Sequence, residues 1–560
     1  MQMRKYLSLY DNWLAYRKAI KVYDNWQAYR KARKVFLSRN RNFDIFLKKQ
    51  LEDYKPTRSA IATPIEDEST TKLDSRHYKF NFQNLVLAGG GAKGVAYCGV
   101  ARALEEHGIL NDIDRFAGTS AGAIVAALLS IGCNSHDVEE IMNVNIERLL
   151  KDSCCFRRCH PANKFRKYIG EVFALKTDNP DITFREAYRK YGKELCIIVT
   201  NANMMTEEYC HVKTTPHLSI RDAVRMSISI PVELKPFRYS MLGDASLYID
   251  GAVSCNYPIH CFDGCYLSMD RNLPVNMFKH PFKSQSTELN LKTLGCLVHS
   301  EGEDQTLRDQ IEIKCNVPMW LSLAPDTELS RKWKNELNLK EVLSECFLQC
   351  RKVQTEILKM FQGKEEFSFE EFENILNKAS DERKESGAKN EAAWIRAKTY
   401  AETLYGEDVN AKMVFEDIKK RDNKKVTKDE WLNYNYETLY LLRHKYRTIE
   451  RKDIVGIWSF FSLMFAGLHS AVTKMYFEEG DVARTVFINT GYIDSLNFAM
   501  EDEDKTFLIK QGKCSTEEFL KTIVQSNKLE RDTNYESRVV PTDKSFNKEE
   551  LAKLKQYKFF

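Results

Sequence analysis

The chain has 560 residues, of which 43% are hydrophobic and 29% are charged, and its formal charge is +5. A chain this apolar is not wholly disordered, and charges that recur along nearly its whole length argue against a polytopic membrane protein. At roughly 100–200 residues per domain, about three or four domains are expected. Residues 1–58 hold 15 Lys and Arg against 5 Asp and Glu, a local charge of +10, so the remaining 502 residues sum to −5.

Residues 1–55 form a basic, aromatic N-terminal arm with a tandem repeat. Residues 10–22 and 23–35 match at 11 of 13 positions. Thirteen residues at 100° each leave equivalent side chains about 220° apart on one helix, so the copies cannot share a packing face. The pattern favours an exposed arm, and the alternative is contact with an anionic membrane or nucleic acid. Residues 56–83, rich in Pro, Ser and Thr, are predicted to be a linker.

Cysteine usage favours a reducing site of action. There are fifteen Cys, an odd number, and no secretory apolar segment follows Met1. We expect these thiols to serve as small core residues. The nearest approach to a zinc site is Cys154, Cys155, Cys159 and His160, which lacks a second ligand pair, so no metal is predicted.

A glycine-rich turn follows an apolar strand at residues 84–87. Its residues are Gly89, Gly90, Gly91, Ala92, Lys93 and Gly94, and a helix is expected to begin directly after them. Backbone amides in such a turn can point at an anion, and the helix N-terminus adds partial positive charge. The segment matches G-x-G-x-x-G, so a dinucleotide site is an alternative, but it fails as a P-loop because Val95 follows Gly94.

A second motif, Gly118-Thr-Ser-Ala-Gly122, matches the G-x-S-x-G pattern of a nucleophile elbow. A short strand is expected before it and a helix over residues 123–129 after it. Small residues around Ser120 allow the sharp turn that exposes a nucleophilic hydroxyl at a helix N-terminus.

A third motif begins at Asp250, which follows an apolar strand-like run and precedes Gly251. Taken alone, it reads as an ordinary Asp-Gly turn.

Together, in this order, the three motifs resemble the patatin-like phospholipase family over about residues 84–330. The matching residues are Gly89 to Gly94, Gly118 to Gly122 and Asp250 to Ala252, with Asn256, Pro258 and the segment 227–236 also similar. The resemblance implies an α/β fold with three layers, α/β/α. It also implies the activity of a lipid acyl hydrolase that uses no cofactor.

The resemblance also implies the roles of the site residues. Ser120 would be the nucleophile and Asp250 the base of a Ser-Asp dyad. The amides of Gly90, Gly91 and Ala92 would form the oxyanion hole, with Gly89, Lys93 and Gly94 in the same loop. The alternative is a Ser-His-Asp triad that uses His260 or His299.

A basic cluster lies between the elbow and Asp250. It consists of Arg157, Arg158, Lys164, Arg166 and Lys167. These side chains are candidates for binding phospholipid headgroups, and the alternative is a solvated helix face.

Residues 331–560 are predicted to be a mostly helical targeting or regulatory domain, because residues 326–540 contain no proline. Within them, residues 454–473 carry no formal charge, which favours a buried core helix over a helix that inserts into or spans a membrane. Residues 414–430 have an EF-hand rhythm, but Lys419 and Lys424 occupy the first and sixth loop positions, so calcium binding is not expected.

The expected function is that of a phospholipase A or lysophospholipase cleaving glycerophospholipid acyl esters. The layout resembles bacterial secreted patatin-like effectors, which implies a signal-peptide-independent route into host cytosol and peripheral binding to host membranes. A host activator such as ubiquitin or a small GTPase is implied as well, and no nucleic-acid partner. The alternative is a catalytically silent protein that sequesters a host small GTPase through its helical domain.

Overall fold

The computed structural model describes eight main stretches of the chain. They are residues 75–150, 160–264, 289–300, 323–338, 361–374, 411–434, 477–532 and 545–555, apart from positions 232, 241–244, 362, 420–423, 527, 528 and 530, together with the single positions 267, 355, 358, 359, 460, 464, 467 and 472. The predicted arm 1–55, Arg157, Arg158, Cys154, Cys155 and Cys159 lie outside the described residues. Two compact units make up the chain: one comprises residues 64–331 and 453–560, the other residues 1–63 and 332–452.

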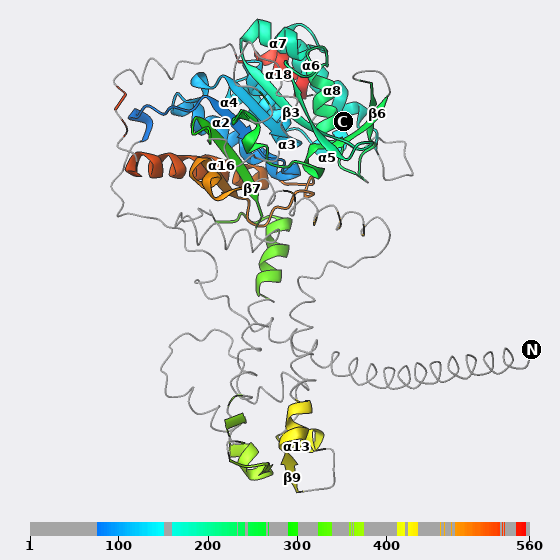
Figure 1. The fold of residues 1–560 in the computed structure, drawn as a ribbon, viewed down its shortest axis with the longest axis vertical. Helices are drawn as coiled ribbons and strands as arrows, with labels where there is room; N and C mark the ends of the chain where they lie inside the picture. Colours follow the sequence, from blue (N-terminus) through cyan, green and yellow to red (C-terminus); the bar gives the residue numbers. More distant parts are fainter. Residues whose placement is uncertain are drawn as a thin grey trace, which may run out of the picture. The chain divides into compact units, whose positions relative to one another are not determined.

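The first unit is built on an eight-stranded sheet with the order β10-β7-β1-β2-β3-β6-β5, and β4 pairs with β3 off this path. Strands β10, β7, β1, β2 and β3 are mutually parallel, whereas β4 and β6 run antiparallel to β3 (Figure 1). The strands are β1 (Asn84–Leu87), β2 (Arg115–Thr119), β3 (Glu194–Asn201), β4 (Thr206–His211), β5 (Phe237–Tyr239), β6 (Ser246–Asp250), β7 (Thr293–His299) and β10 (Thr485–Asn489). The predicted α/β fold is confirmed.

Helices connect these strands and cover the sheet. The α-helices of this unit are α2 (Ala96–Glu106), α3 (Ala121–Ser130), α4 (Ser135–Met142), α5 (Ile146–Leu150), α6 (Asn163–Thr177), α7 (Phe184–Tyr191), α8 (Ile220–Ser227), α16 (Asp502–Ser526) and α18 (Lys548–Lys555). Short 3-10 helices are η1 (Ser75–His77), η2 (Gly91–Val95), η3 (Leu110–Asp112), η4 (Gly251–Val253), η5 (Ile259–Phe262) and η6 (Glu479–Arg484).

The sheet is covered on both faces, so its central strands β1 and β3 are buried at every position rather than at alternate ones and are mostly apolar. Helix α3 packs over β1, β2 and β3. A core cluster with Val86, Ala117 and Ile198 also contains Tyr257 and Phe262 from the segment that follows Asp250. The segment that follows β6 therefore packs on the central strands β1, β2 and β3.

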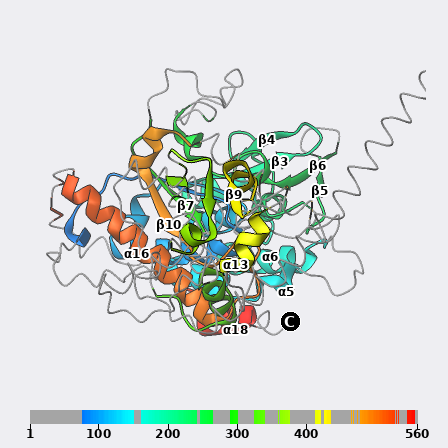
Figure 2. The ribbon, with the colours of Figure 1, turned by 90° about the horizontal axis from the view of Figure 1, so that it is seen from below.

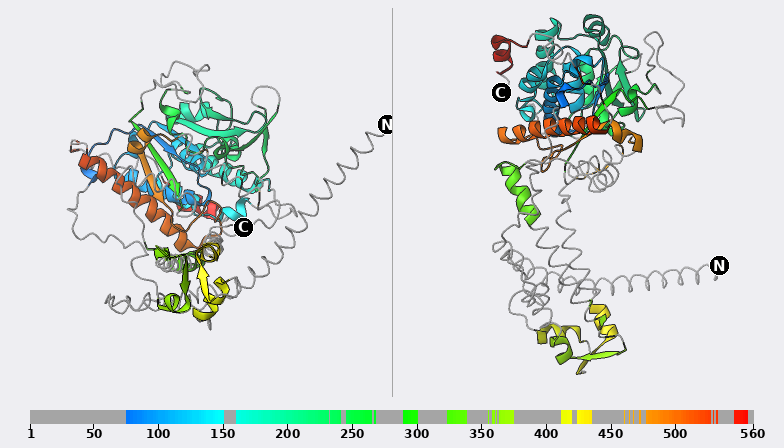
Figure 3. Two further views of the ribbon diagram at one scale, coloured as in Figure 1. Left: turned by 60° about the horizontal axis from the view of Figure 1, so that its bottom comes forward. Right: turned by 90° about the vertical axis from the view of Figure 1, so that its left-hand side faces the viewer.

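Residues 453–560 belong to the same unit as the motifs, whereas the sequence predicted that a separate domain begins at residue 331. Strand β10 extends the parallel sheet beside β7, and α16 packs along α2 (Figures 2 and 3). The two helices approach closely because both carry glycine at the crossing: a Cβ on Gly99 would lie 1.9 Å from Ile509 O, and one on Gly512 would lie 1.9 Å from Ala96 O. The predicted linker is likewise structured at its end, where Phe80 and Phe82 are buried.

The second unit contains a pair of EF-hand-like motifs. Strand β8 (Glu366–Ser368) pairs antiparallel with β9 (Lys425–Thr427), and Phe367 faces Val426 at the centre. Helix α13 (Ala411–Ile418) precedes β9. The core is aromatic, with Phe367 in ring contact with Phe361, Phe372, Phe415 and Trp431. The sequence indicated the second motif, but the first, centred on Phe367, was not predicted.

Neither EF-hand-like loop has the ligands that calcium needs. With Phe367 at the eighth loop position, as Val426 is in the second loop, Lys364 stands at the fifth and Glu371 at the twelfth. Lys364 Nζ lies 2.7 Å from Glu371 Oε1, so the carboxylate at the twelfth position is already paired with an ammonium group. In the second loop, the Glu430 carboxylate accepts hydrogen bonds from the Thr427 amide and hydroxyl, at 3.0 and 2.9 Å.

Other predictions are tested only in part. The segment 454–473 is described at four positions, of which Phe460 and Met464 are exposed and Val472 is buried. Within the described residues, we find no helix with the length and apolar character that crossing a membrane requires. Among the described cysteines, seven are buried, as expected of small core residues: Cys98, Cys133, Cys196, Cys210, Cys255, Cys261 and Cys296.

Candidate active site

Ser120 occupies a strained turn between β2 and α3. Its backbone angles are φ 52° and ψ −121°, a conformation that non-glycine residues rarely adopt. The turn is tight because Gly118 and Gly122 touch each other: a Cβ on Gly118 would lie 2.4 Å from the carbonyl carbon of Gly122. The predicted nucleophile elbow therefore has the geometry that its sequence indicates.

Asp250 ends β6 and faces Ser120. The Ser120 hydroxyl donates a hydrogen bond to Asp250 Oδ2 at 2.8 Å, and the Ala252 amide donates to Asp250 Oδ1 at the same distance. Antiparallel pairing with β3 fixes the position of the strand, with Asp250 opposite Val199. Residues 130 apart in sequence are thus brought within direct proton-transfer distance.

Burial changes the acidity of this carboxyl group. Asp250 is only 1% exposed. Burial raises its pKa from 3.8 to about 7, and the hydrogen bonds from Ala252 and Ser120 offset part of that rise. A base with a pKa near neutrality can take a proton from a hydroxyl and return it to a leaving group.

The end of α8 and the residues that follow it hold the backbones of both residues. The Ser120 amide donates to Ser227 Oγ at 2.8 Å, and the Ser227 hydroxyl donates to Ile198 O at 2.6 Å. The Asp250 amide donates to Ser229 O at 2.9 Å. Because its proton goes to Ile198, the Ser227 hydroxyl serves as an acceptor for the Ser120 amide.

The glycine-rich loop lies against the elbow, but several of its amides already have acceptors. The Gly89 amide donates to Asn256 O at 3.0 Å, the Ala92 amide to Ser495 O at 2.8 Å and the Lys93 amide to Gly90 O at 3.1 Å. Gly91 has a φ of +54°, and a Cβ there would lie 2.1 Å from Ser495 O.

Three nearby amides remain available for an oxyanion. Within the described part of the chain, no acceptor is found for the amides of Gly90, Gly91 and Ala121, the first residue of α3. The Gly94 position touches the elbow directly, since a Cβ there would lie 2.5 Å from Ala121 Cβ. Gly90 and Gly91 match two of the three predicted donors, whereas Ala92 would first have to leave Ser495.

The two histidines considered for a triad lie elsewhere. His260 is buried, and its Nε2 is 2.7 Å from the Tyr209 hydroxyl. His299 ends β7, two strands from the elbow. The hydrogen bond of the Ser120 hydroxyl goes to Asp250 instead, so the geometry favours the dyad.

The basic cluster is described at Lys164, Arg166 and Lys167, all on α6. Arg166 Nε lies 2.7 Å from Asp222 Oδ1, and Lys167 Nζ lies 3.8 Å from Glu171 Oε1. These ion pairs are compatible with a solvated helix face. A role in binding headgroups is left as a prediction.

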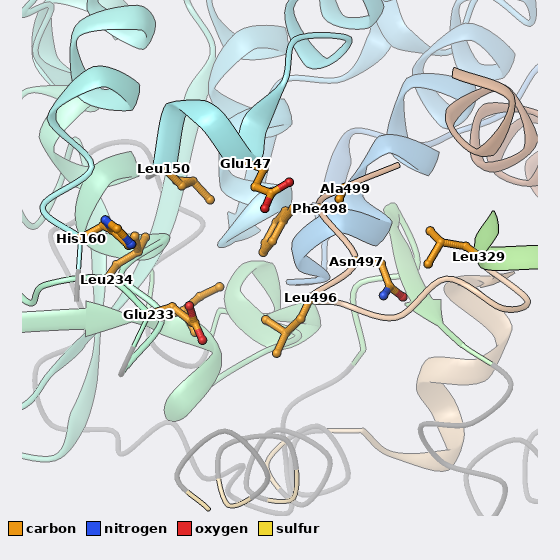
Figure 4. Close-up of a pocket in the computed structure, with 11 residues that line it drawn as sticks. Glu147, Leu150, His160, Glu233, Leu234, Leu329, Leu496, Asn497, Phe498 and Ala499 are labelled. Atoms are coloured by element: carbon orange, nitrogen blue, oxygen red, sulfur yellow. The ribbon is translucent and has the colours of Figure 1, made fainter. Parts of the chain in front are cut away.

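A pocket of about 240 Å³ lies between α5, the segment that follows α8 and the C-terminal segment (Figure 4). Its apolar side chains include Leu150, Ile230, Leu234, Leu329, Leu496 and Phe498, and its polar ones are Glu147, His160, Glu233 and Asn497. Two of the lining residues directly follow, in the sequence, residues that bind the backbone near the site. Ile230 follows Ser229, which binds the Asp250 amide, and Leu496 follows Ser495, which binds the Ala92 amide. The pocket lining thus combines the motif region with the C-terminal segment.

The family model for patatin-like phospholipase matches residues 85–263, which contain the glycine-rich loop, Ser120 and Asp250. Residues 85–263 form a patatin-like phospholipase domain. The resemblance that the three motifs predicted is therefore confirmed, and the domain belongs by family to the lipid hydrolases.

Several known proteins are similar to part of this chain. A probable lipid hydrolase of invertebrate iridescent virus 6 is 29% identical over 195 residues, 33% of this chain and 64% of that protein. Triacylglycerol lipase 4 of Saccharomyces cerevisiae is 30% identical over 214 residues, 31% of this chain and 22% of the yeast protein. Among solved structures, VipD of Legionella pneumophila is similar with a TM-score of 0.37 and 13% identity, covering 80% of this chain and 68% of VipD.

Some residues of the site had no signal of their own in the sequence. Ser227 lies in the segment 227–236 that resembles the family, but no motif marks it. Ser495 and the pocket residues 496–499 fall within the predicted helical domain. Their roles depend on contacts between segments far apart in the chain.

Within the described residues, no group of three or more His, Cys, Asp and Glu side chains is arranged to hold a metal ion.

Proposed function

We propose that the patatin-like domain hydrolyses glycerophospholipid acyl esters, as a phospholipase A or lysophospholipase, through a dyad of Ser120 and Asp250. The observation that carries the proposal is the 2.8 Å hydrogen bond from the Ser120 hydroxyl to Asp250 Oδ2, at a strained elbow beside amides that have no acceptor of their own. Serine is a weak nucleophile until a base takes its proton, and Asp250 is placed to do so.

The reaction proceeds in two halves. Ser120 Oγ attacks the ester carbonyl carbon while its proton passes to Asp250, and the amides of Gly90, Gly91 and Ala121 stabilise the negative oxygen that develops. Removal of one such donor costs roughly 3–4 kcal/mol in other oxyanion holes. Asp250 then protonates the departing alcohol, which leaves an acyl group on Ser120. Water then attacks the acyl carbonyl carbon while its proton passes to Asp250, and Asp250 returns that proton to Ser120 Oγ as the fatty acid is released.

This pocket, whose lining includes the residues that follow Ser229 and Ser495, is proposed to hold part of the acyl chain. Among the described residues, its lining contains six large apolar side chains and two carboxylates, which favours an apolar chain over an anionic headgroup there. Its volume of about 240 Å³ is too small for a whole long chain, so the remainder would extend outside.

The test is fatty-acid release from phospholipid vesicles by purified full-length protein. Ser120→Ala and Asp250→Asn should each abolish release while circular dichroism shows a retained fold. A fluorophosphonate probe, which modifies activated serines, should label the wild type and not Ser120→Ala. Full activity in Asp250→Asn would disprove the dyad, and loss of activity in a folded His260→Ala variant would support a triad.

The proposal extends to an effector that acts at host membranes, which stays a prediction from the layout of the sequence. Measuring release with and without host cytosol tests both this and the alternative of a silent GTPase-binding protein. Activity that appears only with cytosol supports an enzyme regulated by a host protein. No activity in any lysate, with an unlabelled Ser120, supports the binding protein.

A further inference from the structure

The turn that joins β3 to β4 carries two exposed methionines. Met204 and Met205 are each 67% exposed, among the most exposed large apolar side chains of the described residues. The turn itself is well held: the Met205 amide donates to Asn201 O at 2.7 Å, and the Asn203 and Met204 amides donate to Asn201 Oδ1 at 3.0 and 3.2 Å. A rigid backbone therefore presents both side chains to the outside.

Stability does not explain these residues. Met205 has a φ of +54°, a left-handed conformation in which Gly and Asn are comfortable and a long side chain is strained. Such strain is of order 1–3 kcal/mol where a residue is held in a sparsely populated region. Isolated exposed apolar residues are common on protein surfaces, but adjacent ones at the end of a rigid hairpin make a small apolar contact surface.

The turn lies at the edge of the sheet that carries the active site. Strands β1, β2 and β3 are parallel, and the glycine-rich loop, Ser120 and the methionine turn follow their respective carboxyl ends. Thr119 is paired with Ile198, and β3 continues for three further residues to Asn201. At about 3.3 Å per residue, the strand extends about 10 Å past the level of the nucleophile, and the turn lies beyond it.

We propose that Met204 and Met205 form a membrane-docking tip, which inserts into the interfacial region of a bilayer and brings the catalytic edge to its lipid substrate. Interfacial segments bury their apolar side chains about 5–10 Å deep, which is comparable to the reach of the tip beyond Ser120. The nearest charged residues along the chain are Glu207 and Glu208, so apolar burial rather than attraction to anionic lipid drives the contact. The inference rests on the proposed function, because only an enzyme for membrane lipids needs this orientation.

The test uses the double variant Met204→Gln, Met205→Asn. Asn suits the left-handed backbone at position 205, so the variant should fold at least as well as the wild type. The matched control is Leu291→Gln. Leu291 is 68% exposed and precedes β7, which places it at the opposite edge of the same sheet.

Binding is measured by sedimentation with phosphatidylcholine vesicles at 0.15 M salt, in full-length proteins that also carry Ser120→Ala so that the lipid stays intact. Zwitterionic lipid keeps the basic residues 1–55 from dominating the result. We expect the double variant to bind about tenfold or more weakly and the Leu291 variant to bind like its parent. With Ser120 present, hydrolysis of vesicle lipid should fall by a similar factor, and hydrolysis of a soluble short-chain ester should stay within twofold.

Equal vesicle binding by the double variant and its parent would overturn the proposal and leave a protein partner as the occupant of the tip. Equal losses in the double variant and the Leu291 variant would also overturn it. If the Ser120→Ala protein binds vesicles through the tip but the wild type hydrolyses no ester, the proposed function fails and the docking surface stands.

Discussion

Asp250 combines two properties that conflict with each other. Its carboxyl group must be ionised to accept the proton of Ser120, yet burial raises its pKa to about 7. Because the pKa in the folded state lies above the unfolded value, the native state binds more protons between about pH 4 and pH 7. The stability that this provides is complete below the unfolded pKa and is lost as the pH rises through about 7. Ionisation of Asp250, which its role as a base requires, therefore lowers the free energy of unfolding.

Asp250→Asn should therefore be inactive and more stable than the wild type at pH 8. The amide keeps the shape of the side chain and removes the buried charge. From the raised pKa, the free energy of unfolding of the variant should exceed that of the wild type by at most about 4 kcal/mol. Thermal melts at pH 5 and pH 8 measure the effect, which should be small at pH 5.

In the wild type, ester hydrolysis should rise through about pH 7 and then level off; a pH-independent rate would contradict Asp250 as the base.

Ser227 is expected to position the nucleophile without touching substrate. Ser227→Ala leaves the Ser120 amide buried without its acceptor, which costs about 1–3 kcal/mol. We expect kcat to fall about 10- to 100-fold with little change in KM, because the strained turn at Ser120 loses its support. Labelling by the fluorophosphonate probe should slow in parallel, and Ser227→Thr, which keeps the hydroxyl, should recover part of the rate.

Ser130→Ala is the matched control for this variant. Ser130 is also buried, at the end of α3, but its hydroxyl donates a hydrogen bond to Ala127 O of its own helix. If Ser227→Ala and Ser130→Ala keep the same kcat, Ser227 has only a structural role.

At the scale of elements, the EF-hand-like pair is held by the pairing of β8 with β9, by the ion pair of Lys364 with Glu371 and by the aromatic cluster around Phe367. Calcium would have to displace the Lys364 ammonium group, and the second loop offers Lys at its first and sixth positions.

Adding calcium should therefore change neither the melting temperature nor the fluorescence of the protein relative to EDTA. Trp431, which is buried in the aromatic cluster, makes fluorescence a direct report on this pair. A saturable change with calcium that disappears in Glu371→Gln would reveal a metal site and contradict this expectation.

How much the sequence predicted depends on how local each element is. The glycine-rich loop, the elbow and Asp250 each lie within one strand and its following turn, so their residues could be identified by pattern. The first EF-hand-like motif lacks acidic residues at most ligand positions and gave no signal. Strand β10 is a five-residue run within a long proline-free tract, and its place beside β7 depends on a sheet assembled from distant segments.

At the scale of the whole molecule, the patatin-like domain is completed by residues far beyond the family match. Ser495 holds the glycine-rich loop, Leu496 and Phe498 line the pocket, and α16 covers α2. Catalysis should therefore depend on the C-terminal segment even where that segment contributes no catalytic side chain. A substitution at the contact between α2 and α16 can test this dependence without shortening the chain.

Gly512→Ala should destabilise the catalytic unit and reduce hydrolysis. Its Cβ would lie 1.9 Å from Ala96 O, and a backbone atom cannot move aside without shifting α2, which begins directly after the glycine-rich loop. Overpacking of this kind costs about 1–3 kcal/mol or more. Gly467→Ala is the matched control: it makes the same change in the same C-terminal segment, but nothing lies within 4 Å of its Cβ. We expect a lower melting temperature and lower activity only for Gly512→Ala; equal stability of the two variants would mean that α16 does not pack on α2.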